Sequence, residues 1–399
     1  METTITLIAD LILLFKQLHM VMEARNLWTL AAMTALWLKG KPAHVYALGK
    51  ALPCQGKLES RVQKLRRWVS NPTIRPQQSI SARLQLLAPL LSQLPELILI
   101  IDRTEWTRRG ASMNLFLGSI AFHGRAFPMY WILLPKRGCS SLEDQKALLT
   151  PVFTALAAHP LLAQMRTTVV ADREFCSPTL ARWLKHLGMP FCLRVKKSSR
   201  VSRPEIPSIP IRAFFAPCQP GTSSVFTNVR LTEEHQFRCN LFLFWREDCQ
   251  EPLALITDRE EATIVADSYH DRMFIETLNR DLKSSGYDRE HGKMTDPKRL
   301  ENVLIPIAFA YIVSVIQGHV EELIQPVPPL KNRTHSLFTR ARNRMRDVLD
   351  RTPLASILQF FQQFFQFLLT LLLQKSADTV THVFRTYARP QSLLLEGIP

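Results

Sequence analysis

The chain has 399 residues, 46% of them hydrophobic, so it is long enough for more than one structural unit and can form a sizeable core. Its 50 Lys and Arg outnumber its 34 Asp and Glu, which gives a formal net charge of +16. This composition argues against wholesale disorder and indicates a polyanionic partner, either nucleic acid or an anionic membrane surface; a basic enzyme without such a partner is the alternative.

No stretch of the sequence predicts a secretory signal or a membrane span. The N-terminus carries Glu2 and Asp10 and lacks a basic region ahead of its apolar residues. Residues 303–316 are shorter than the roughly 20 residues of a span, and residues 357–373 are interrupted by glutamines, so both are expected to be buried or interface helices. The charge therefore favours nucleic acid over a membrane, and seven cysteines without zinc-type spacing indicate reduced thiols in a cytoplasmic protein.

Residues 1–95 are predicted to be helical, and one of their helices is both amphipathic and basic. Between Leu58 and Ser70, apolar residues recur at helical spacing on one side, and Asn71-Pro72 ends the helix. The pattern favours a helix that lies on a DNA backbone, although a solvated basic face on a packed helix fits it too. The four basic side chains of this helix are Arg61, Lys64, Arg66 and Arg67.

Short apolar runs after the helical region predict strands. The run at 97–101 predicts a buried strand that ends at Asp102, and residues 113–122 and 126–134 predict a hairpin with a tight turn. Further along this part we predict a helix at 141–156, a strand at 167–171 that ends at Asp172, a helix at 177–187 and a strand at 191–195.

Residues 198–262 are rich in Pro, Ser and Thr and predict a small β-rich insertion. Its strand-like runs lie at 225–231, 237–245 and 252–257. The segments that follow are predicted helices at 263–284 and 298–320, a basic segment at 331–346 and an apolar helix at 357–373. Strands and helices mixed in this order predict an α/β core flanked by helical N- and C-terminal regions.

Asp102 and Asp172 share one sequence context, since each directly follows an apolar run that predicts a strand. In open α/β sheets, ligands bind beyond the carboxyl ends of the strands, so both carboxylates are expected to face one crevice. Each aspartate is also followed by Arg and then closely by Glu. Either aspartate alone fits a helix cap or a turn, but two in one sheet favour a functional pair.

A polar stripe is predicted on the helix at 263–284. At about 100° per residue, its polar side chains fall within a strip roughly 60° wide, and its apolar side chains fall on the far side. The strip holds Tyr269, Arg272, Glu276 and Lys283. A salt-bridged solvent face, with Glu276 paired to Arg272, is the alternative, and the two aspartates shift the balance toward a functional role.

Carboxylates from three separate elements are typical of a divalent metal site. We therefore predict that Asp102, Asp172 and Glu276 are catalytic and hold two Mg²⁺ ions, with Mn²⁺ as a substitute. Two such ions, about 4 Å apart, can activate water and stabilise the leaving 3′ oxygen in an in-line attack on phosphorus. Arg272 and Lys283 are expected to neutralise phosphate beside this site.

The spacing Tyr269-x2-Arg272-x3-Glu276-x6-Lys283 resembles the YREK signature of the IS4-type bacterial insertion-sequence transposases. Those enzymes are DDE transposases with an RNase H-like catalytic core and a β-rich insertion between the second Asp and the Glu, where residues 198–262 lie in this chain. The resemblance spans most of the chain, since it also covers residues 102–106, 172–175, 286–290 and the basic residues 334–349.

The resemblance implies cut-and-paste transposition of an insertion sequence. Water nicks one strand at the element's end, and the freed 3′-OH attacks the other strand, often through a hairpin, and then target DNA. The implied regions are a helical DNA-binding region at 1–95, an RNase H-like core at 96–197 and 263–325, the β-rich insertion at 198–262 and a helical C-terminal region at 326–399.

The resemblance also implies roles for further residues and partners. Tyr269, Arg272 and Lys283 are expected to bind DNA phosphate. Some relatives stack a Trp on a flipped base, but Leu253 stands at that position here, so Trp245 is the candidate for base stacking and the hairpin step stays open. The implied partners are the double-stranded terminal inverted repeats, target DNA and a second copy in a synaptic homodimer, in the bacterial cytosol at the nucleoid. An RNase H-like nuclease and a catalytically inactive DNA-binding relative remain the alternatives.

Overall fold

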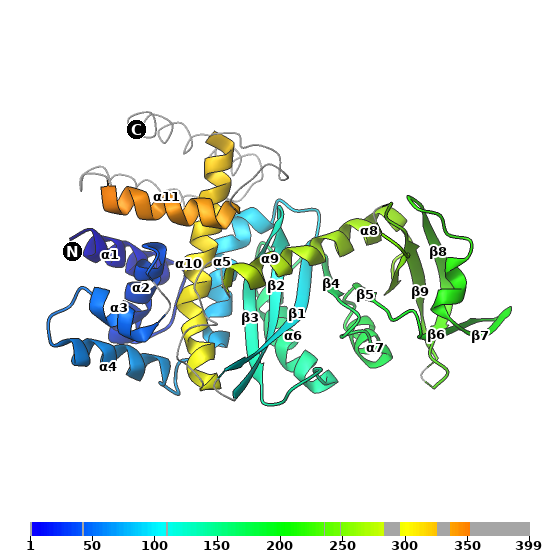
Figure 1. The fold of residues 1–399 in the computed structure, drawn as a ribbon, viewed down its shortest axis with the longest axis horizontal. Helices are drawn as coiled ribbons and strands as arrows, with labels where there is room; N and C mark the ends of the chain where they lie inside the picture. The colour runs from blue at the N-terminus through cyan, green and yellow to red at the C-terminus, as the bar shows by residue number, and fades with distance from the viewer. Residues whose placement is uncertain are drawn as a thin grey trace.

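A large mixed β-sheet extends from a helical region at one end of the molecule to a β-rich extension at the other in the computed structural model (Figure 1). The structure describes residues 2–41, 44–108, 111–234, 236–247, 249–282, 296–324 and 336–351. Within them the sheet has ten strands in the order β3-β2-β1-β4-β5-β10-β9-β8-β6-β7. The chain is therefore a mixed α/β protein with flanking helices.

The first three strands form an antiparallel meander around a buried apolar run, and the predicted hairpin is confirmed. β2 pairs antiparallel with both β1 and β3. His123 and Gly124 have φ angles of 42° and 80°, and two successive positive values are those of a two-residue type I′ turn. The bounds of these strands are Leu97–Arg108 for β1, Ala111–Phe122 for β2 and Arg125–Leu134 for β3.

The strands β4 (Thr167–Ala171) and β5 (Phe191–Arg194) continue the sheet in parallel with β1. The prediction that β1 ends at Asp102 is wrong, because β1 continues to Arg108. Beyond Asp102 the strand pairs with β2 alone. Pairing with one antiparallel neighbour keeps the backbone extended there without requiring buried apolar side chains, so the end of the apolar run does not mark the end of the strand.

The β-rich insertion continues the same sheet. β10 pairs antiparallel with β5, and β9 and β8 follow it outward. The bounds are Arg200–Arg203 for β6, Ile206–Pro210 for β7, Ser223–Leu231 for β8, Phe237–Phe244 for β9 and Leu253–Thr257 for β10. The side chains of β9 and β10 that bury against the core join the insertion to the hydrophobic interior of the molecule.

Helices pack at the β3 edge and on both faces of the sheet (Figure 1). The helix α10 (Pro297–Ile324) contacts both β3 and α2, so it joins the N-terminal helices to the sheet. It is long and apolar enough to cross a membrane, but 94% of its most apolar window is buried in the protein, as in a core helix. The other helices are α1 (Glu2–Gln17), α2 (Ala24–Leu38), α3 (Val45–Ala51), α4 (Leu58–Val69), α5 (Ile80–Leu91), α6 (Leu142–Ala157), α7 (Pro178–His186) and α11 (Leu337–Arg351).

The segment that carries the polar stripe is not one regular helix. It consists of α8 (Ala262–His270), a 3-10 turn at Asp271–Met273 and α9 (Phe274–Arg280). The expectation of an uninterrupted helix at 263–284 is therefore wrong. A 3-10 turn winds more tightly than an α-helix, so the angles of a regular helix do not apply across it. Lys283, the segment at 286–290 and the apolar helix predicted at 357–373 lie outside the described residues.

Candidate active site

Asp102 and Asp172 lie at the same level on neighbouring strands. The last paired residues of β1 and β4 are Ile101 and Ala171, so each strand next presents an aspartate. Both carboxylates approach one nitrogen, Nη2 of Arg272: Asp102 Oδ1 is 3.3 Å from it and Asp172 Oδ2 is 3.7 Å from it. The two aspartates are therefore close enough to act on one ligand.

Asp102 points to the face of the sheet that α9 covers. On β2, Gly118 faces Leu148 of α6, so the preceding Leu117 and its strand partner Asp102 point to the opposite face. There Asn279 of α9 donates a 2.9 Å hydrogen bond from Nδ2 to Asp102 Oδ2. The helix that carries Glu276 thus also fixes this carboxylate.

Burial changes the protonation behaviour of Asp102. It raises the pKa of the Asp102 carboxyl to about 6, while the Arg272 guanidinium opposes this rise and the Glu276 carboxylate adds to it. A buried carboxylate is costly unless a cation or hydrogen-bond donors compensate its charge. Asp102 therefore depends on positive charge beside it to remain ionised near neutral pH.

Arg272 links all three predicted carboxylates. Besides the two aspartates, it contacts Glu276, with 2.7 Å between Nη1 and Oε1. Burial by itself lowers the pKa of the Arg272 guanidinium, but Asp102, Asp172 and Glu276 together raise it. Its Nε is buried and has no hydrogen-bond partner in the part of the chain that the structure describes. The guanidinium therefore lies in the middle of the acidic cluster.

Glu276 and Tyr269 reach the cluster from the two sides of the 3-10 turn. The Glu276 side chain stays 52% exposed, and its ion pair with Arg272 is the one expected for a solvent face. Because Arg272 is itself buried and contacts both aspartates, this pair belongs to the cluster instead. Burial and the nearby Asp172 raise the pKa of the buried Tyr269 phenol, so its hydroxyl stays protonated at neutral pH.

Asp172 has partners that the sequence reasoning missed. Its Oδ1 accepts hydrogen bonds from the Arg173 backbone N–H at 2.7 Å and from Arg194 Nη1 at 3.3 Å. Arg194 ends β5, the strand next to β4, and Asn279 lies one helical turn after Glu276. Their positions could have revealed both residues. Arg194 stands at the end of a predicted strand, and Asn279 lies three residues after the predicted metal ligand Glu276.

A second ion pair joins the two strands just beyond the aspartates. Arg103 donates to Glu174 through both Nε and Nη2, at 2.5 Å and 3.0 Å, and its Nη1 lies 3.0 Å from Glu105 Oε2. This bidentate geometry is specific for a guanidinium and a carboxylate. The repeated Arg and Glu after each aspartate therefore form a cross-link that holds the two strand ends together.

The cluster fits a divalent metal by the chemistry of its donors. Carboxylate oxygens from Asp102, Asp172 and Glu276 are ligands that Mg²⁺ and Mn²⁺ prefer. Among the described residues, however, no group of three Asp, Glu, His or Cys side chains lies close enough to hold an ion as it stands. The reason is visible in the contacts: the Arg272 guanidinium lies between the oxygens that an ion would bind.

A separate buried network lies at the opposite edge of the sheet and anchors α8. Arg259 donates to Glu96 through Nη1 at 3.1 Å and through Nη2, and Thr168 donates to the same carboxylate at 3.0 Å. Ser268 of α8 donates to Glu96 at 3.1 Å. Because Tyr269 follows Ser268 directly, this network fixes the approach of α8 to the acidic cluster.

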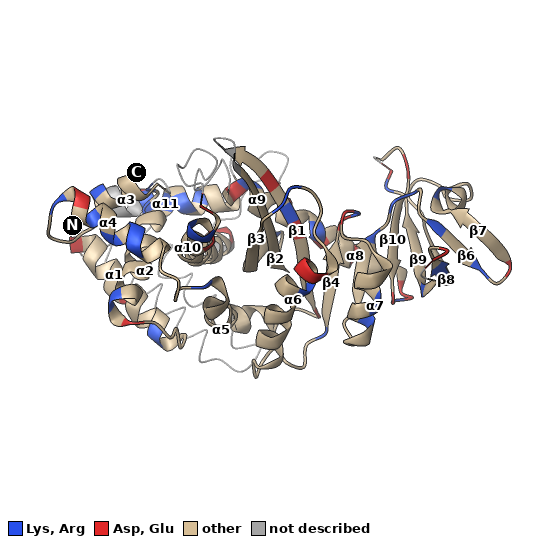
Figure 2. Ribbon diagram, turned by 90° about the horizontal axis from the view of Figure 1, so that it is seen from below, with Lys and Arg blue, Asp and Glu red and all other residues tan. Residues whose placement is uncertain are grey.

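The predicted basic residues of α4 divide into two pairs. Arg61 donates to the Leu52 carbonyl at 3.2 Å, and the Lys64 ammonium lies 3.7 Å from the centre of the Trp28 ring, so both bind within the protein. Arg66 and Arg67 are exposed. They line a groove of about 510 Å³ between α3 and α4. This groove is at the helical end of the molecule, where α11 also carries Lys and Arg (Figure 2).

Trp245 lies at the same edge of the sheet as the aspartates. β10 runs antiparallel to β5, so β10 begins at the carboxyl edge of β4 and β5. Its first residue, Leu253, pairs with Phe244 at the end of β9, and Trp245 directly follows Phe244. Three strand spacings separate β9 from β4, roughly 14 Å. The indole Nε1 donates to the Cys249 carbonyl at 2.9 Å and the ring remains partly exposed.

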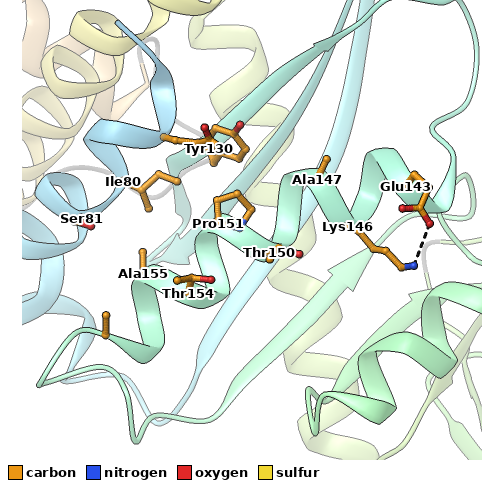
Figure 3. Close-up of a pocket in the computed structure, with 12 residues that line it drawn as sticks. Ile80, Ser81, Tyr130, Glu143, Lys146, Ala147, Thr150, Pro151, Thr154 and Ala155 are labelled. Atoms are coloured by element: carbon orange, nitrogen blue, oxygen red, sulfur yellow. Dashed lines mark hydrogen bonds and ion pairs between the residues drawn. The ribbon is translucent and has the colours of Figure 1, made fainter. Parts of the chain in front are cut away.

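A groove of about 740 Å³ between α5, α6 and β3 is remote from this chemistry (Figure 3). Ile80, Tyr130 and Pro151 line it, and an ion pair of 3.0 Å between Lys146 and Glu143 lies at one end. None of the candidate site residues that the structure describes lines this groove. It therefore takes no part in the site.

The fold and the site together describe a mixed α/β protein with an acidic cluster at the carboxyl edge of its central sheet. Residues 93–313 match the family model of the transposase DDE domain, so the chain belongs to this family. Among solved structures, it is similar to a piggyBac transposase in a synaptic complex with hairpin DNA, at 12% identity and a TM-score of 0.42, over 93% of this chain and 83% of that chain. No curated protein matches it.

Proposed function

We propose that the protein is a transposase of the IS4 type that moves an insertion sequence by cut-and-paste transposition, through DNA strand cleavage and strand transfer. The observation that carries this proposal is the contact of Asp102, Asp172 and Glu276 with one guanidinium, inside the region that matches the transposase DDE domain. The order of the first five strands supports an RNase H-like core, because an antiparallel meander is followed by two strands parallel to β1.

The three carboxylates are assigned to two Mg²⁺ ions, with Mn²⁺ as a substitute. When bound, these ions supply activation of the attacking oxygen and stabilisation of the leaving 3′ oxygen. Asp102 lies in β1 and Asp172 directly follows the neighbouring β4, and Asn279 restrains one oxygen of Asp102. A ligand held in this way keeps its orientation when its charge is shared with an ion.

Tyr269, Arg272 and Lys283 are assigned to DNA phosphate. The Tyr269 hydroxyl stays protonated, so it acts as a hydrogen-bond donor to a phosphate oxygen and not as a base. A guanidinium binds a phosphate through two parallel hydrogen bonds. Among the described residues no acceptor binds Nε of Arg272, so this nitrogen can donate one of them. The partly exposed ring of Trp245 is the proposed stacking surface for an unpaired base.

The proposed partner is double-stranded DNA, as terminal inverted repeats and as target. A net charge of +16 and the exposed Arg66 and Arg67 of α4 support this assignment. Two element ends must be held at once, so we propose a homodimer in the synaptic complex and a cytoplasmic location at the nucleoid. The predicted apolar helix at 357–373 remains the candidate for the dimer contact.

Cleavage of DNA that carries the inverted repeats flanking the gene tests the proposal. With Mg²⁺, the wild-type protein should nick the repeat ends, and EDTA should stop the reaction. The variants D102N, D172N and E276Q should bind this DNA as the wild type does and fail to cut it. The control E143Q removes a carboxylate from the exposed surface of α6 and should cut normally. Cutting by any of the three carboxamide variants would contradict the assignment.

A further inference from the structure

The Arg272 guanidinium occupies the centre of the acidic cluster. Its Nη2 approaches Asp102 Oδ1 and Asp172 Oδ2 at 3.3 Å and 3.7 Å, and its Nη1 lies 2.7 Å from Glu276 Oε1. One cation therefore bridges carboxylates from a strand, a strand end and a helix. These are the same oxygens that the proposed function assigns to metal ligation.

A metal ion and this guanidinium cannot share those oxygens without cost. Mg²⁺ binds carboxylate oxygens at about 2.1 Å in a near-octahedral shell. A guanidinium within hydrogen-bond distance of the same oxygens then lies a few ångströms from a dication, in a buried place where like charges repel strongly. Occupation by one cation therefore weakens occupation by the other.

The surroundings of Arg272 allow the exchange. Its Nε is buried without a partner among the described residues, so moving the side chain breaks no hydrogen bond at that atom. Arg272 lies within the 3-10 turn between α8 and α9, where the intrahelical hydrogen bonds change pattern. The Glu276 side chain is half exposed. The ion pair of Arg272 and Glu276 can therefore separate and re-form with little change in the burial of the Glu276 carboxylate.

We propose that Arg272 is an exchangeable counter-ion: it compensates the three carboxylates, divalent metal displaces it, and the displaced guanidinium becomes available to an anionic oxygen such as that of a phosphodiester. This inference rests on the proposed function, because it uses the same metal ligands. It adds that metal binding and the availability of Arg272 are coupled. Asn279, which donates to the other oxygen of Asp102, is neutral and does not compete.

Equilibrium binding of Mn²⁺ to the full-length protein without DNA tests the competition. Because R272Q removes the bridging positive charge and keeps a polar side chain, it should bind Mn²⁺ roughly ten-fold more tightly than the wild type. The matched control R280Q removes an exposed positive charge from the end of α9, the helix that follows the turn, and should bind as the wild type does. Equal or weaker binding by R272Q would overturn the proposal.

Thermal unfolding of the same proteins gives an independent readout. In EDTA, R272Q leaves three carboxylates without their shared cation and should unfold at a lower temperature than R280Q. Saturating Mn²⁺ should raise the unfolding temperature of R272Q more than that of the wild type, because tighter binding to the folded state stabilises it more. Equal shifts in both proteins would count against the exchange.

The counter-ion role of Arg272 and the metal assignment of the carboxylates can fail separately. Loss of Mn²⁺ binding in E276Q together with unchanged affinity in R272Q leaves the metal assignment standing and removes the counter-ion role. Unchanged Mn²⁺ affinity in E276Q and D102N removes both. Tighter binding in R272Q that disappears in the double variant R272Q/E276Q supports both, because the gain then comes from the carboxylates that Arg272 contacts.

Discussion

Asn279 and Asp102 join α9 to β1 through a 2.9 Å hydrogen bond between the carboxamide Nδ2 and the carboxylate Oδ2. The bond connects the helix that carries Glu276 to the strand that carries the first aspartate. Both partners are buried, so it restrains the carboxylate in a place that water hardly reaches. Asp102 and Glu276 are therefore positioned relative to each other by Asn279, a residue outside the acidic cluster.

N279A should reduce metal-dependent DNA cleavage by about 10- to 100-fold, the usual effect of losing a hydrogen bond that orients a metal ligand. Single-turnover cleavage rates measured against Mg²⁺ concentration would separate weaker metal binding from a slower chemical step. T277A shortens a half-buried side chain of the same helix and serves as the control. Wild-type rates in N279A would show that the hydrogen bond does not orient Asp102.

The buried network around Glu96 should contribute to the stability of the fold. E96Q leaves the Arg259 guanidinium buried with a neutral partner, which should lower the free energy of unfolding by about 3 kcal/mol or more. The double variant E96Q/R259M removes the uncompensated cation and should recover much of this loss. Urea unfolding at neutral pH measures both values, and additive losses in the double variant would contradict the pairing.

Stability should decrease as the pH rises from about 4 to about 6, partly because of Asp281. Burial raises the pKa of this carboxyl to about 6 from an ordinary value of 3.8, and Arg125 opposes the rise. The folded state therefore holds the proton more tightly than the unfolded chain, so the stabilisation is complete below pH 3.8 and is lost as the pH passes 6.

D281N should flatten this pH dependence, since an amide does not titrate in this range. Unfolding measured at several pH values between 4 and 7 gives the slope of stability against pH. The absolute stability of D281N will also reflect the loss of the 3.2 Å ion pair with Arg125. Burial also raises the pKa of Asp102 and of Asp271 to about 6, so part of the slope should remain. An unchanged slope in D281N would contradict the assigned cause.

The two pairs of basic residues on α4 should differ in their effect on DNA binding. R66A/R67A should flatten the plot of log K against log[salt] by about 1.8, because each phosphate neutralised contributes about 0.9. R61A/K64A should change this slope little and instead lower stability, since these side chains contact Leu52 and Trp28. Equal slopes in the two double variants would contradict this division.

Much of the sheet could be predicted because its strands are short apolar runs between turn residues. The run before Asp172 coincides with β4, and the hairpin turn falls at His123 and Gly124, as expected. The length of β1 could not be predicted from its own residues. Beyond Asp102 its pairing with β2 depends on a neighbour whose register is set by the turn and not by hydrophobicity.

The site could be predicted at the level of residue types but not of contacts. The 3-10 turn at Asp271–Met273 has no Gly or Pro to mark it, so helical spacing treated a segment that the turn interrupts as one regular helix. Burial of Arg272 among carboxylates depends on three distant segments and leaves no local pattern. Likewise, the aromatic partner of Lys64 lies in another helix, so its basic charge alone could not reveal an intramolecular role.

The sheet that holds the aspartates continues without interruption into the outermost strands of the insertion. Neighbouring strands in such a sheet share one right-handed twist. The ladder runs from β8 and β9 through β10 and β5 to the end of β4, where Asp172 lies. The insertion and the strand that ends at Asp172 are thus parts of one hydrogen-bonded ladder, a connection that a module on a flexible linker would lack.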